Sequence, residues 1–132
     1  MPSNAAIIRS VLDAWAAGDV ETIVAAMAED CELIPLRAQL EGTSYRGHEG
    51  VRRFYEDLNA DWENLRLPYD EVREVGDSVV VFARLVARGR TSGVDLDVPI
   101  GQLWDLRDGR VLRLRAFTEP EDALRAAGAE HE

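Results

Sequence analysis

The sequence predicts an α+β fold: a cone-shaped α+β barrel in which N-terminal helices pack on a curved, mostly antiparallel sheet and enclose a pocket. Three segments carry this prediction. They are a pair of amphipathic helices at 11–30, a further helical stretch at 45–58 and a strand–turn–strand segment at 102–117. Helices that precede a long antiparallel sheet are expected to close one side of that sheet.

Composition predicts a single domain over residues 1–132, because this length is sufficient for one core. The chain is 46% hydrophobic and carries a net charge of −10. A surface this acidic repels phosphate backbones and anionic lipids, so nucleic acid and membranes are not expected partners. No secretory signal is recognisable, which predicts a cytoplasmic location, and the lone Cys31 fits a reducing compartment.

Two helices are predicted near the N-terminus. Apolar residues recur at the i, i+3, i+4, i+7 spacing of one helix face in two stretches, namely Ile8, Val11, Leu12 and Trp15, then Val20, Ile23, Val24 and Met27. Gly18 is expected to end the first helix as a left-handed cap, and Asp19 to cap the start of the second.

A short strand, a loop and a third helix are expected next. Residues 31–36 favour a strand that Pro35 restricts to an edge or an end, and residues 37–47 form a loop. The third helix is predicted from another apolar stripe, which Trp62 continues: Val51, Phe54, Tyr55 and Leu58.

The pattern becomes typical of strands after Pro68, with strands expected at 79–88, 94–106 and 111–117. Asp108-Gly109 is a strong signal for a two-residue hairpin turn. A regular hairpin with this turn has two sets of pairs on opposite faces: Gly101 with Ala116 and Leu103 with Leu114, then Gln102 with Arg115 and Trp104 with Arg113.

This register predicts both a pocket and an interface. Two small residues, Gly101 and Ala116, leave a hollow beside larger apolar neighbours on the face that the helices cover. The alternative is that Gly101 is only a bulge that bends the sheet. The opposite face carries Trp104 beside Arg113, which suits a homodimer interface better than open water.

Three segments resemble a known family: AWAAGDVETIVAAMAEDCEL, YRGHEGVRRFYEDL and VPIGQLWDLRDGRVLRLRAF. They are similar to the nuclear transport factor 2-like superfamily, and within it to the SnoaL-like proteins. The resemblance covers nearly the whole chain and implies a cone with a pocket. Its members include ketosteroid isomerases, polyketide cyclases and non-catalytic binding domains, so the fold does not determine the function.

The resemblance also argues against steroid isomerisation. Ketosteroid isomerases use an aspartate base, with a tyrosine and a protonated aspartic acid as the oxyanion hole. Those positions fall on Pro35, Val11 and Gly101 in this chain, and none of these residues can do the chemistry. Tyr55 matches a supporting pocket tyrosine.

Asp97 is the predicted general acid or base. It shares a strand face with the expected pocket, and an apolar pocket would raise the pKa of its carboxyl group. The alternative is a salt bridge to Arg88 or Arg90. Arg84 either reaches the pocket, where it would bind a carboxylate or an enolate, or lies on the dimer face, depending on the length of the hairpin loop.

Two further residues are catalytic candidates. His48 starts the third helix and is a candidate general base, or else an exposed residue that helps the helix begin. Tyr55 is expected to donate a hydrogen bond to a ligand carbonyl, or else to lie in the core. The residues predicted to bind the ligand are Trp15, Tyr45, Phe54, Trp62, Gly101, Leu103, Leu114 and Ala116. For Trp15 and Trp62 the alternative is a plain core position, because helical spacing alone does not distinguish the two.

No metal site or cofactor is expected, because the chain lacks the ligand set of a zinc site and has no phosphate-binding motif. The sequence predicts a SnoaL-like homodimer that binds a small apolar organic molecule. If it is an enzyme, the reaction is proton transfer next to a carbonyl, as in an isomerase, dehydratase or cyclase. The alternative is a binding or dimerisation module without turnover.

Overall fold

The computed structural model describes residues 2–130 and has the predicted α+β architecture. The helices are α1 (Asn4–Ala17), α2 (Val20–Ala25), α3 (Leu36–Glu41), α4 (Gly47–Asp61) and α5 (Pro120–Glu130). The strands are β1 (Met27–Ile34), β2 (Tyr45–Arg46), β3 (Trp62–Arg66), β4 (Tyr69–Val75), β5 (Ser78–Gly89), β6 (Asp95–Arg107) and β7 (Arg110–Phe117). No described helix is both long and apolar enough to cross a bilayer.

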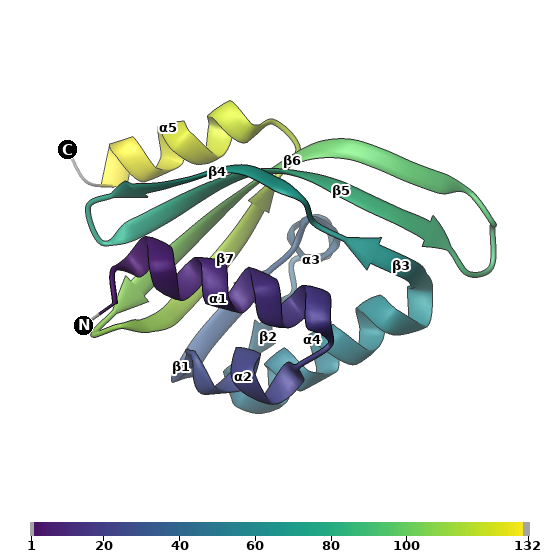
Figure 1. The fold of residues 1–132 in the computed structure, drawn as a ribbon, viewed down its shortest axis with the longest axis horizontal. Helices are drawn as coiled ribbons and strands as arrows, with labels where there is room; N and C mark the ends of the chain where they lie inside the picture. Colours follow the sequence, from purple (N-terminus) through teal and green to yellow (C-terminus); the bar gives the residue numbers. More distant parts are fainter. Residues whose placement is uncertain (1, 131–132) are drawn as a thin grey trace.

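The strands form one curved, mixed sheet in the order β2-β1-β7-β6-β5-β3, with β4 also paired to β5. β1 runs parallel to β7, and the other pairs are antiparallel. Helices α1, α2 and α4 lie on one side of this sheet and α5 lies on the other (Figure 1). We call the side that faces α1 the inner face and the side that faces α5 the outer face.

Local signals place the first two helices. The Ser3 side chain accepts a hydrogen bond from the Ala6 amide at 3.1 Å and so caps α1. Gly18 ends α1 with a φ of 72°, and Asp19 caps α2 by accepting from the Thr22 amide at 3.2 Å. Both predicted caps are confirmed.

Several predicted boundaries were wrong. Met27 belongs to β1 rather than to the second helix, because it pairs with Val111 of β7. The expected loop at 37–47 contains most of α3 and all of β2, and Trp62 starts β3 rather than continuing the third helix. Helix α5 was not predicted, although Pro120 followed by two acidic residues is a recognisable helix start.

The predicted hairpin turn is confirmed, but the predicted register is wrong. Asp108 and Gly109 have φ values of 54° and 77°, as a type I′ turn requires, and Arg107 faces Arg110. After Leu106 pairs with Val111, the register shifts, and Asp105 pairs with Arg113. Leu112 is therefore an extra residue, a β-bulge, and every later pair moves by one position.

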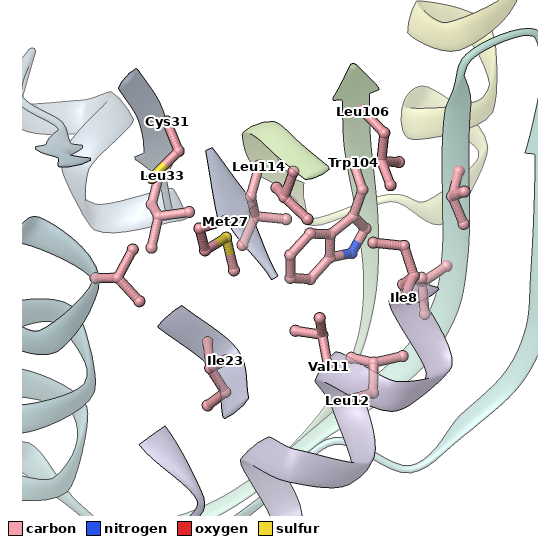
Figure 2. Close-up of a cluster of buried hydrophobic side chains, with 14 of the residues drawn as sticks. Ile8, Val11, Leu12, Ile23, Met27, Cys31, Leu33, Trp104, Leu106 and Leu114 are labelled. Atoms are coloured by element: carbon pink, nitrogen blue, oxygen red, sulfur yellow. The ribbon is translucent and has the colours of Figure 1, made fainter. Parts of the chain in front are cut away.

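With the bulge included, the side of β6 that faces the helices is the opposite of the predicted one. Trp104 pairs with Leu114, is only 1% exposed and belongs to the main core, so it cannot supply a dimer interface. Figure 2 shows its ring projecting toward Val11 and Leu12 of α1. Gly101 instead lies on the outer face, where a Cβ atom would be 2.6 Å from Pro120 Cα.

Two cores follow from this arrangement. The larger one packs part of the inner face against helices α1, α2 and α4. The smaller one joins the outer face to α5 through four fully buried side chains: Val80, Leu103, Ala123 and Ala127. Because α5 completes this second core, Leu103 has a packing role on the outer face.

Candidate ligand-binding site

A cavity of about 1260 Å³ lies between the inner face of the sheet and helices α1, α3 and α4. Small-molecule sites commonly occupy about 300–1,000 Å³, so this space can hold a sizeable organic ligand. Most of its lining is apolar, and the side chains come from segments far apart in the chain. The curved sheet and the helices together create this space.

An aromatic wall forms one part of the cavity. The Trp15 ring on α1 meets the Phe54 ring on α4 edge to face, with centroids 5.5 Å apart. The Tyr45 ring of β2 lies 5.1 Å from the same Phe54 ring. All three residues line the cavity, as does Trp62, so aromatic rings are available to pack against a flat ligand.

The sheet supplies the floor. Ile100, Gln102 and Trp104 point inward from β6, and Leu114 and Ala116 do so from β7. The Trp104 indole nitrogen donates a hydrogen bond to the Gln102 side-chain oxygen at 3.0 Å. A neutral amide therefore stands on an otherwise apolar floor.

The charged lining residues are exposed to solvent. Four carboxylates and one guanidinium line the described cavity: Asp13, Glu41, Asp57, Asp61 and Arg66. The Tyr45 hydroxyl donates to Asp57 Oδ2 at 2.6 Å. Asp13 and Asp57 place carboxylate charge at the exposed edge of the cavity, its entrance, which disfavours anionic ligands there.

Asp97 and Arg84 lie outside the cavity. Both are on the outer face, and Arg84 Nε contacts Asp97 Oδ1 at 2.7 Å. The Asp97 side chain is 62% exposed and the Arg84 side chain is 48% exposed. The alternative reading of Asp97 as half of a salt bridge thus describes its position, with Arg84 as the partner instead of Arg88 or Arg90. A carboxylate on the outer face does not line the cavity, so it is not in position to act on a ligand there.

His48 and Tyr55 are also absent from the cavity lining. His48 Nε2 lies 2.9 Å from the Met27 carbonyl oxygen, to which it donates, and so ties the start of α4 to β1. The Tyr55 ring packs 5.8 Å from Trp15, and a Cβ placed on Gly18 would lie 3.2 Å from its hydroxyl. Tyr55 therefore points toward the α1–α2 connection.

The predicted ligand-binding residues separate into two groups. Six of the eight line the cavity: Trp15, Tyr45, Phe54, Trp62, Leu114 and Ala116. The positions expected for Gly101 and Leu103 are wrong, because both residues face α5. Gln102 was missed because the predicted register placed it on the outer face. The sequence does contain a sign of the register shift: Val111 and Leu112 are adjacent apolar residues, and they interrupt the alternation of apolar and polar residues along β7.

The residues that the isomerase resemblance assigns are also dispersed. Pro35 lines the cavity, Val11 is buried in the main core, and Gly101 lies on the outer face. The catalytic arrangement of that enzyme is therefore missing from this cavity.

The arginines of the expected dimer face bind an aspartate instead of stacking on Trp104. Arg113 Nε donates to Asp105 Oδ2 at 2.9 Å, and a terminal nitrogen of Arg115 donates to the same oxygen at 3.2 Å. Ser78 donates to the other carboxylate oxygen at 2.5 Å. This network is on the outer face, opposite the cavity.

The described residues provide no cysteine nucleophile and no metal centre in the cavity. Cys31 is buried in the main core, and burial raises the pKa of its thiol, which disfavours the reactive thiolate. No group of three or more His, Cys, Asp or Glu side chains that the structure describes is arranged to hold a metal ion.

Comparisons with solved structures show the same fold. A nuclear transport factor 2-like protein from Burkholderia pseudomallei is 21% identical, with a TM-score of 0.80 over 95% of this chain and 97% of that chain. A putative SnoaL-like polyketide cyclase from Jannaschia is 26% identical, with a TM-score of 0.77 over 96% of this chain and 92% of that chain.

A third structure, TerC co-crystallised with polyporic acid, is 23% identical, with a TM-score of 0.77 over 94% of this chain and 97% of that chain. None of the curated protein sequences matches the chain significantly. The SnoaL-like domain model, however, matches residues 8–114. With most of its length matched and the fold shared, the chain belongs to the SnoaL-like domain family.

Proposed function

We propose that this protein binds a small, mostly apolar organic molecule in the cavity between the sheet and α1, α3 and α4. The observation that carries the proposal is the cavity itself, with about 1260 Å³ of space and a largely apolar lining. Sites for small molecules combine such walls with a few well-placed polar groups, and Gln102 and Tyr45 are two here.

The comparisons support this proposal. TerC, which shares the fold, was crystallised with polyporic acid, a small organic molecule. The acidic entrance of this cavity favours a neutral or cationic ligand over an anionic one, which narrows the range of candidates.

A catalytic role is a second candidate, and one contact favours it. Tyr45 and Asp57 both line the cavity and are joined by a 2.6 Å hydrogen bond. A carboxylate beside the ligand could accept a proton from a carbon next to a carbonyl, with the phenol holding it in position. Asp57→Asn would remove the base, and it should abolish turnover while leaving ligand affinity within about twofold.

Ligand binding can be tested by equilibrium dialysis with 2-acetylnaphthalene and by mass spectrometry of molecules that co-purify with the protein. Ala116→Leu should obstruct the floor and weaken binding at least tenfold. The matched control is Val86→Leu, which adds volume on the outer face and should leave binding unchanged, because Val86 does not line the cavity. Equal binding by both variants would refute the assignment of this cavity.

A further inference from the structure

The Gln102 amide has a defined orientation on the floor of the cavity. An indole nitrogen can only donate a hydrogen bond, so the 3.0 Å contact with Trp104 must involve the Gln102 oxygen. The amide nitrogen is thereby turned away from the indole. Trp104 is 1% exposed and held in the main core, so this orientation rests on a rigid support.

Gln102 also lies on a central strand of the sheet. This strand is β6, where Gln102 is paired with Val81 of β5 and Ala116 of β7. Its side chain is half-buried and lines the cavity. Among residues 2–130, Trp104 is the one hydrogen-bond partner of this side chain. The two N–H donors of the amide thus have no acceptor within the described protein.

We propose that Gln102 determines the specificity of the cavity by donating a hydrogen bond to a carbonyl oxygen of the ligand. This inference rests on the proposed function and names its ligand class: a neutral, largely apolar ring compound with a carbonyl group at its buried end. A site built to hydrogen-bond a substrate group rejects analogues that leave its polar atoms unpaired. The amide oxygen already accepts from Trp104, so the floor favours acceptor groups over donor groups.

A matched pair of probes tests the inference. 2-Acetylnaphthalene and 2-isopropenylnaphthalene have nearly the same shape, but only the ketone can accept a hydrogen bond. Their affinities are measured by equilibrium dialysis, and the ketone-to-alkene ratio is compared between the native protein and Gln102→Met. Comparing this ratio between the two proteins cancels the greater tendency of the alkene to leave water, because that tendency is a property of the probes alone. The native ratio should be about three- to tenfold higher, the range for one neutral hydrogen bond.

Gln102→Glu provides a variant that keeps an oxygen for the Trp104 indole. Its carboxylate form has no donor, so the native selectivity for the ketone should disappear at high pH. Burial raises the pKa of such a carboxyl group. As the pH falls through that pKa, the protonated carboxyl can donate, and selectivity should return. A residue that serves only to satisfy Trp104 would produce no such pH profile.

Infrared spectroscopy gives a measurement that needs no variant, because a donated hydrogen bond lowers the C=O stretching frequency of the bound ketone. Two results would overturn the inference while the proposed function stands. One is a ketone-to-alkene affinity ratio that Gln102→Met leaves unchanged, and the other is a C=O band of the bound ketone at the frequency it has in an apolar solvent. If neither probe binds the native protein, the proposed function fails, and the inference fails with it.

Discussion

Replacing Gly101 with alanine should weaken the docking of α5 on the sheet without disturbing the ligand cavity. A Cβ atom at this position would lie 2.6 Å from Pro120 Cα and 3.1 Å from Ala123 Cβ. Carbon atoms pack best at about 3.5–4.0 Å, so the start of α5 must retreat by about 1 Å. The contact is with backbone, which cannot rotate away as a flexible side chain would.

The expected cost is that of overpacking a filled core, about 1–3 kcal/mol in the free energy of unfolding. Urea denaturation followed by circular dichroism should therefore show a midpoint lower by about 0.5–2 M. Hydrogen exchange should localise the loss to α5. Affinity for 2-acetylnaphthalene should stay unchanged, because Gly101 faces away from the cavity.

Gly128→Ala is the matched control, because it makes the same chemical change within α5 itself. A Cβ at Gly128 meets nothing within 4 Å, and alanine favours the helix, so stability should rise by about 0.5–1 kcal/mol. A Gly101→Ala protein as stable as the native one would refute the outer-face packing. Lost ligand affinity with intact stability would instead place Gly101 in the cavity.

Three other outcomes follow from the structure. Ala116→Leu should leave the melting temperature unchanged or raised, as expected when a side chain fills empty space, and a fall of more than a few degrees would mean that the floor is already filled. 2-Naphthoate should bind about tenfold more weakly than 2-acetylnaphthalene at low salt, because exposed carboxylates at the entrance repel an anion. Salt screens this repulsion, so the difference should be smaller at high salt. Equal affinities at low salt would contradict this expectation. Burial raises the pKa of Cys31 above its usual 9.0, so its contribution to stability is present below that value and is lost as the pH rises above it. Denaturation from pH 8 to 10 should show a decline that Cys31→Ala reduces.

The candidate site was predictable to the extent that helices build it. Trp15 and Phe54 lie on amphipathic stripes whose apolar side must face the sheet, and both line the cavity in the structure, although helical spacing alone does not separate a cavity position from a core position. Asp97 could not be placed in the same way. Strand residues alternate between two faces, and the period says which residues share a face but not which face the N-terminal helices cover.

Sequence alone determined the features that depend on neighbouring residues: the left-handed cap at Gly18, the cap at Asp19 and the positive-φ turn at Asp108-Gly109. These need only local backbone geometry and a nearby donor or acceptor. The tertiary structure decided which side of β6 faces the cavity. One extra residue at Leu112 moves every later pair by one position, and the two-residue period of a strand then turns Gln102 and Trp104 inward and Gly101 outward. Packing settles that choice, because Trp104 fills the main core while only glycine fits beneath α5.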